Sequence, residues 1–269
     1  MTPPRRLTRR SFVRHLGKGT LAIAVFGPVA CSDSSSPTTK APVTTLAGTT
    51  PPPTGPSSTA TTSETTEPSA STAVPTTWKH VALGNVSAYI LATNERATIV
   101  DTGNRGSEGE IEASLAGIGL GWDSVDHVIA THLHGDHIGS FAAVMNAAPT
   151  AMGYAGEADL GAVSSPRSLR AVGDGDEVAG FHIIETPGHT AGHVAVFDPV
   201  GGVLVAGDAL NTSSGSVLGS DPRYTADDSA AGESVQKMAQ LDFGVLLVGH
   251  GDPVLSDANA AVVALAASL

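Results

Sequence analysis

Short apolar runs bounded by turn residues fill the chain from residue 78 onward. The first three runs, at 78–83, 87–91 and 97–101, are separated by Gly84-Asn85 and Asn94-Glu95, a pattern that predicts an antiparallel meander. Further strands are predicted at 125–131, 181–185, 202–206 and 245–248, and helices at 108–118, 138–146, 227–241 and 257–267. Because strands are followed by helices in both halves, residues 78–269 are expected to form one α/β domain with a substantial hydrophobic core.

The two segments before residue 78 differ from this domain in composition. Residues 31–77 consist mainly of Thr, Ser, Pro and Ala with almost no large apolar side chain, so they predict a disordered linker. The six basic residues of positions 1–30 precede any acidic residue, and the run Thr8-Arg9-Arg10-Ser11-Phe12-Val13-Arg14 resembles a twin-arginine export signal. The apolar stretch that follows, residues 20–30, is too short to cross a bilayer. We therefore expect residues 1–30 to be a signal peptide.

The single cysteine, Cys31, ends that apolar stretch in Pro28-Val29-Ala30-Cys31. This run resembles a lipobox, in which the cysteine becomes the lipidated first residue of the mature protein, although Pro28 stands where a leucine-like residue is usual. The resemblance implies a lipoprotein tethered to the outer face of the cytoplasmic membrane. The alternative is ordinary cleavage nearby, which would leave a secreted or periplasmic protein. The sequence does not indicate the oligomeric state.

The charge of the chain is strongly acidic and bears on its partners. There are 14 Lys and Arg against 26 Asp and Glu, a formal net charge of −12. Removal of residues 1–30 takes away six basic residues and no acidic one, which leaves 8 against 26 and a charge of −18. Because binding to phosphate backbones needs a basic surface, nucleic acid is disfavoured as a partner. A small-molecule substrate is expected instead.

The run Thr131-His132-Leu133-His134-Gly135-Asp136-His137 places three imidazoles and a carboxylate directly after an apolar strand. A lone histidine is usually a satisfied surface or core residue, but this density of metal ligands is hard to explain as packing. Three later apolar runs also end in a metal-binding residue preceded by glycine, namely His189, Asp208 and His250. If these strand ends meet at one edge, they form a preorganised metal site.

In this order, His-x-His-x-Asp-His, Pro-Gly-His-Thr, Gly-Asp and Gly-His-Gly resemble the motifs of the metallo-β-lactamase-fold hydrolases. The resemblance covers the chain from about Trp78 and includes Ile99-Val100-Asp101-Thr102-Gly103. It implies a four-layer αβ/βα sandwich and a catalytic centre with two divalent metal ions, Zn²⁺ by expectation, with Fe or Mn as alternatives. By the same resemblance, one metal is bound by His132, His134 and His189, and the other by Asp136, His137 and His250, while Asp208 bridges the two.

The resemblance also implies the roles of two carboxylates and of the nucleophile. A hydroxide bridging the metals would attack a carbonyl carbon, with Asp136 orienting it and relaying a proton to the leaving group. Asp101 is expected to accept a hydrogen bond from the second ring nitrogen of a ligand imidazole; a turn-capping role is the alternative.

The bridging Asp208 and the lack of a cysteine in residues 78–269 resemble the thioesterase and lactonase branches, such as glyoxalase II, more than the true β-lactamases. The expected reaction is therefore cleavage of an ester, thioester, lactone or amide bond. Glutathione recognition is not expected, because no Lys or Arg follows His250. Tyr154 or Tyr224 is a candidate for a substrate contact, and residues 211–226 for a mobile loop. The alternatives are an iron-dependent sulfur dioxygenase of the same fold and a non-catalytic metal-binding module.

Overall fold

The computed structural model describes residues 76–269. The predicted signal peptide at 1–30, all but the last two residues of the predicted linker at 31–77, and the predicted lipidation at Cys31 lie outside these residues and stay predictions. Within residues 76–269, no helix combines the length and the apolar character needed to span a bilayer.

The first sheet has the strand order β1-β2-β3-β4-β5-β6. Strands β1 to β3 pair antiparallel, as predicted for the meander, and β3 to β6 pair parallel. The strands are β1 (Thr77–Leu83), β2 (Val86–Thr93), β3 (Arg96–Val100), β4 (Val125–Ile129), β5 (Met152–Gly156) and β6 (Arg170–Val172). The helices of this half are α1 (Glu108–Ala116), α2 (Gly135–Ile138) and α3 (Phe141–Ala147), with short 3-10 turns at Trp122–Ser124 and Leu160–Ala162.

The second sheet has the order β13-β10-β9-β8-β7, and its only parallel pair is β10 with β13. Its strands are β7 (Glu177–Val178), β8 (Phe181–Glu185), β9 (Val194–Asp198), β10 (Val203–Gly207) and β13 (Val245–Val248). A separate hairpin consists of β11 (Leu210–Ser213) and β12 (Ser216–Gly219), and the helices are α4 (Asp228–Met238) and α5 (Ala258–Ala266).

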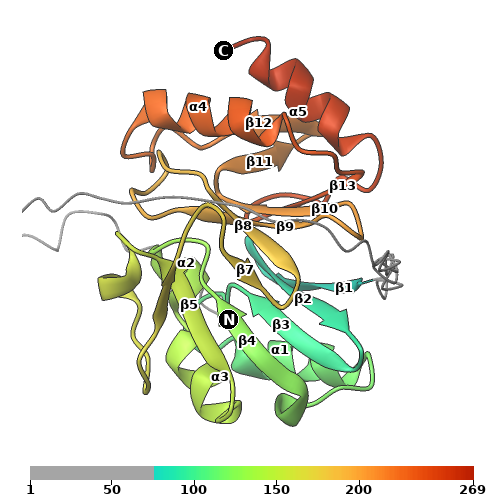
Figure 1. Ribbon diagram of the computed structural model, residues 1–269, viewed down its shortest axis with the longest axis vertical. Coiled ribbons are helices and arrows are strands. Elements are labelled where there is room, and N and C mark those ends of the chain that lie inside the picture. Colours follow the sequence, from blue (N-terminus) through green and yellow to red (C-terminus); the bar gives the residue numbers. More distant parts are fainter. Residues whose placement is uncertain (1–75) are drawn as a thin grey trace, which may run out of the picture. The chain divides into compact units, whose positions relative to one another are not determined.

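Residues 76–269 form four layers, with α1 and α3 on the outer face of one sheet and α4 and α5 on the outer face of the other (Figure 1). Both faces of the central strands are buried, and alternate residues enter different cores. On β10, Val203 and Val205 pack between the two sheets, whereas Leu204 packs against the helices. This arrangement confirms the predicted αβ/βα sandwich.

Two local predictions need correction. The helix predicted at 138–146 begins later, because α2 ends at Ile138 and α3 runs from Phe141 to Ala147. At the end of α2 the carbonyl of His137 accepts from the amide of Thr102 over 2.7 Å. The segment predicted as a loop at 211–226 contains most of the β11–β12 hairpin. Its Ser- and Gly-rich sequence lacks an apolar pattern, and its strands are stabilised by pairing with each other.

Candidate metal centre

The histidine-rich turn that follows β4 is fixed by hydrogen bonds to both sheets. The amide of Thr131 donates to Asp101 Oδ1, at the end of β3, over 2.8 Å. The carbonyl of Thr131 accepts from the amide of Val194, at the start of β9, over 2.8 Å. The turn therefore lies where the two sheets meet. The four strand ends that were expected on one edge come together from two facing sheets.

His132, His134 and His189, called here the three-histidine group, direct one ring nitrogen each toward a common point, with the ligand atoms within 4.8 Å of one another. His134 Nδ1 and His189 Nε2 are 2.9 Å apart. Burial lowers the pKa of His132 well below its usual value and that of His189 to about 4. Both imidazoles are therefore neutral at pH 7 and have a lone pair available for a metal.

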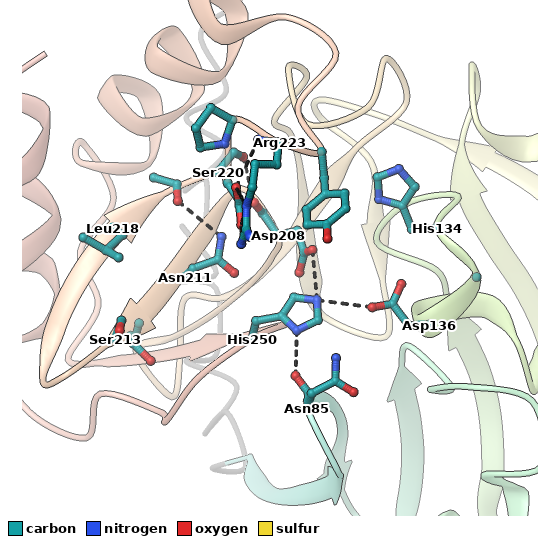
Figure 2. Close-up of a pocket in the computed structure, with 16 residues that line it drawn as sticks. Asn85, His134, Asp136, Asp208, Asn211, Ser213, Leu218, Ser220, Arg223 and His250 are labelled. Atoms are coloured by element: carbon teal, nitrogen blue, oxygen red, sulfur yellow. Dashed lines mark hydrogen bonds and ion pairs between the residues drawn. The ribbon is translucent and has the colours of Figure 1, made fainter. Parts of the chain in front are cut away.

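Asp136, His137 and His250, called here the mixed group, form a second cluster with ligand atoms within 4.8 Å of one another. His250 Nε2 lies 3.3 Å from Asp136 Oδ2 and 3.5 Å from His137 Nε2. The other ring nitrogen of His250 lies 2.6 Å from the carbonyl oxygen of Asn85, in the β1–β2 turn. Figure 2 shows His250 between Asp136, Asp208 and Asn85.

Asp208 directly follows β10 and lies between the two groups. Its Oδ2 is 3.4 Å from His189 Nε2 and 3.3 Å from His250 Nε2, and its Oδ1 is 3.2 Å from His137 Nε2. Burial alone would raise the pKa of Asp208, but the neighbouring His137 and His250 imidazoles hold it well below its usual value. The carboxylate is therefore ionised and within reach of ligands from both groups.

Asp101 sets the orientation of two of these histidines. Its Oδ2 lies 2.8 Å from His137 Nδ1 and accepts from Thr131 Oγ1 over 2.8 Å. Because the hydroxyl proton of Thr131 is used in that bond, Thr131 Oγ1 accepts from His132 Nδ1, 3.0 Å away, and the Nε2 lone pair of His132 is left free. Burial alone would lower the pKa of His137, but Asp101 and Asp208 outweigh it and raise that pKa to about 10.

His193 is buried beside Asp208. It immediately precedes β9, and its Nε2 accepts from the Asp208 amide over 3.1 Å. Its Nδ1 therefore donates to Thr186 Oγ1, 2.7 Å away. Burial lowers the pKa of His193 to about 3, so it is a neutral support for the Asp208 backbone. Its position four residues after His189 was the only signal in the sequence.

The glycines before the later ligands serve two different purposes. Gly188 and Gly207 have positive φ angles of 131° and 51°, as expected for glycines that turn the backbone. Gly249, which precedes His250, has no positive φ. Glycine is needed at this position because there is no space for a side chain. A Cβ built at Gly249 would lie 2.0 Å from Asp208 Oδ1 and 2.7 Å from His137 Cε1.

A cavity of about 990 Å³ opens beside the two groups. His134, Asp136, Asp208 and His250 contribute to its wall, and the rest is supplied by Asn85, the β11–β12 hairpin and residues 220–224, with apolar surface as the larger part. Figure 2 shows Asn211, Leu218 and Arg223 on one side of Asp208, and His134 and Asp136 on the other. The cavity therefore gives a small molecule access to the clustered ligands.

Of the two tyrosines considered from the sequence, only Tyr224 lines this cavity. Its side chain is exposed, and the Arg223 guanidinium carbon lies 5.4 Å from its ring centroid. Arg223 is the only Lys or Arg among the residues of the cavity wall. Tyr154 is buried between the sheets, where its hydroxyl lies 3.1 Å from His127 Nδ1, and this position rules it out as a substrate contact.

The residues fit metal ions by the chemistry of their donor atoms. The buried Nε2 of His132 has no hydrogen-bond partner among residues 76–269, which is costly unless another group, such as a metal, takes its lone pair. Imidazoles that share a point with carboxylates are typical ligands of Zn²⁺ and Fe²⁺. Three protein ligands in each group, with Asp208 between them, leave room for a substrate or water, as in catalytic rather than structural metal sites.

Comparison with known proteins gives three kinds of similarity. The model of the metallo-beta-lactamase superfamily matches residues 81–250. A probable metallo-hydrolase of Methanocaldococcus jannaschii is 32% identical over 152 residues, which cover 56% of this chain and 70% of the relative. A thioesterase of Emericella nidulans is 26% identical over 178 residues, which cover 65% of this chain but only 48% of that relative.

Among solved structures, TTHA1623 in a di-iron-bound form is similar with a TM-score of 0.56 and 27% identity, covering 66% of this chain and 94% of that one. The family match includes both ligand groups and the strands that carry them. The chain therefore belongs to the metallo-β-lactamase superfamily and is a metal-dependent hydrolase.

Proposed function

We propose that the protein is a binuclear hydrolase that cleaves an ester, thioester, lactone or amide bond in a small molecule. The observation that carries this proposal is the position of Asp208, whose two carboxylate oxygens lie within 3.4 Å of nitrogens from both ligand groups. One ion would be held by the three-histidine group and one by the mixed group, with Asp208 between them.

Divalent ions at these positions supply Lewis acidity and lower the pKa of a bound water toward neutrality. The protein contributes the arrangement around them. Asp101 fixes His137 directly and His132 through Thr131, so the ligand nitrogens are oriented before a substrate binds. Asp136 is partly exposed at the cavity, where its carboxylate can orient a water and pass a proton to the leaving group.

The cavity wall combines polar side chains with a larger share of apolar surface. Leu218, Pro222 and Tyr224 are the large apolar contributions, whereas asparagine, serine, threonine and charged side chains supply the polar groups. Such a wall suits a small molecule that carries both an apolar part and polar groups. The similarity to a thioesterase favours thioesters within this class.

The proposal is tested by metal analysis of the domain purified without added metal, followed by assays on thioesters, lactones, esters and β-lactams. We expect about two ions per chain and hydrolysis of at least one small acyl compound. Zn²⁺, Fe or Mn would each be compatible with the ligand set. Oxygen consumption with a persulfide, without any hydrolysis, would instead establish the sulfur dioxygenase of the same fold. The absence of tightly bound metal would refute the proposal.

We further propose that the protein is exported and anchored to the membrane through a lipid on Cys31. The support is the sequence alone: the twin-arginine run and the lipobox-like residues before Cys31. Changing Arg9 and Arg10 to Lys should block export, and Cys31→Ala should release the exported protein from the membrane fraction. Normal export of the first variant would exclude the twin-arginine route, and membrane retention of the second would exclude the lipid anchor.

A further inference from the structure

Asp159 is a buried carboxylate that joins the two segments carrying the three-histidine group. It follows β5 and begins the 3-10 turn at Leu160–Ala162, and its side chain is 1% exposed. Oδ2 accepts from the amide of Leu133 over 3.0 Å and from Thr190 Oγ1 over 2.5 Å, and Oδ1 accepts from the amide of Gly192 over 2.9 Å. Leu133 lies between His132 and His134, and Thr190 directly follows His189.

The backbone around Asp159 is shaped to admit these contacts. A Cβ built at Gly192 would lie 2.4 Å from the Asp159 amide nitrogen and 2.8 Å from its Cβ and Cγ. Any larger residue at 192 would therefore push the carboxylate away from the His189 segment. This close approach, together with the three hydrogen bonds, holds the side chain in place.

In the part of the chain that the structure describes, the negative charge of Asp159 is stabilised by these three hydrogen-bond donors, and a metal ion at the three-histidine group would stabilise it further. Within residues 76–269, no Lys, Arg or His nitrogen lies within 4.0 Å of its carboxylate. A buried carboxylate without a cationic partner is costly. A divalent ion held by the three-histidine group would add positive charge to the same two segments that donate to Asp159, so ion and carboxylate stabilise each other.

We infer that Asp159 is a positioning residue for the three-histidine group, and that it sets the affinity of this group for its ion without serving the mixed group. This inference rests on the proposed binuclear site. Asp159 contacts residues beside His132, His134 and His189, whereas the structure gives it no hydrogen bond to the segments of α2, β10 or β13 that carry the other ligands. Loss of the Asp159 charge should therefore weaken metal binding by the three-histidine group and leave the mixed group largely unaffected.

The test measures Zn²⁺ affinity by competition with a chromophoric chelator in two backgrounds. His250→Ala disables the mixed group, so that binding reports the three-histidine group, and His189→Ala does the reverse. We expect Asp159→Asn to weaken Zn²⁺ at least about 10-fold in the first background, as is usual for residues that orient metal ligands. In the second background we expect a much smaller change. Asn has the same size as Asp, but its NH₂ group is a donor. That group would face one of the N–H or O–H donors that now bond to a carboxylate oxygen of Asp159, so this hydrogen bond would be lost.

Asp198 offers a matched control. It is also a buried carboxylate, and within residues 76–269 its side-chain hydrogen bonds come from the amides of Val200 and Gly201 alone, in the turn between β9 and β10. Asp198→Asn should leave Zn²⁺ affinity unchanged in both backgrounds. If Asp159→Asn does not fold, Thr190→Val and Thr190→Ser replace it. The valine removes the hydroxyl that donates to Asp159, and the serine restores it, so only the valine variant should weaken the three-histidine group.

The outcomes separate this inference from the proposed function. If the parent His250→Ala protein binds no Zn²⁺, the three-histidine group is not a metal site, and the proposed function and the inference both fail. If the parent binds Zn²⁺ and Asp159→Asn binds it equally well, the inference alone fails. Equal weakening in both backgrounds would also overturn it, because it would show that Asp159 only supports the fold.

Discussion

Replacement of Gly249 by alanine tests the site geometry without altering a ligand. The added Cβ would lie 2.0 Å from Asp208 Oδ1, whereas ordinary contacts begin at 3.4 Å, so about 1.4 Å of space must open between the backbone before His250 and the Asp208 carboxylate. Overpacking of this kind usually costs about 1–3 kcal/mol. Because a 1 Å misplacement of catalytic groups costs about 100-fold in rate, we expect kcat/KM to fall roughly 100-fold or more, with loss of one bound ion.

The assay combines hydrolysis, metal content and urea unfolding of the metal-free protein. Gly244→Ala is the control, because a Cβ at Gly244 meets nothing within 4 Å and the residue has no positive φ. This variant should keep both ions and full activity. If Gly249→Ala binds two ions and retains wild-type kcat/KM, Asp208 does not lie where the structure places it, or the enzyme does not need it there.

Two further predictions concern the groups behind the ligands. Burial lowers the pKa of His193 to about 3. Below about pH 6.5, His193 is therefore protonated in the unfolded chain but stays neutral in the folded domain. The free energy of unfolding of the metal-free domain should therefore fall by roughly 2–3 kcal/mol between pH 7 and pH 4.5 because of His193. In urea unfolding, His193→Gln should show a correspondingly smaller fall over the same range. Identical pH profiles of the two proteins would contradict this. Asp101→Asn should weaken metal binding about 10- to 100-fold in chelator competition, because the charge facing His137 is lost; unchanged affinity would disprove that role for Asp101.

The sequence predicted the parts of the fold whose information is local. Continuous apolar runs such as 203–206 and 245–248 are strands buried on both faces, and their apolar character follows from that burial. The cluster from His132 to His137 was recognisable because six consecutive positions carry four metal-binding side chains. The structure brings those four side chains together with His189, Asp208 and His250.

The parts that the sequence did not predict depend on contacts between distant segments. Asp159 is an ordinary acidic residue in Gly156-Glu157-Ala158-Asp159-Leu160, and only the fold brings it to Leu133 and Thr190. His193 shows the same limitation, because its partner, the Asp208 amide, is fifteen residues away. The end of α2 likewise coincides with a contact from a distant segment, the Thr102 amide donating to the His137 carbonyl. Supporting residues are therefore harder to predict than ligands, which gather in motifs.

The ligands are divided between two facing sheets, and this division affects when an ion can be captured. Before the sheets pack, the run from His132 to His137 is the part of the ligand set that is contiguous in the sequence. His189, Asp208 and His250 arrive only with the second sheet. A ligand that binds the folded state more tightly than the unfolded state stabilises the folded state. A bound ion would therefore stabilise the packing of the two halves of the domain against each other. Removal of the metal would then weaken the mechanical connection between the sheets as well as the chemistry.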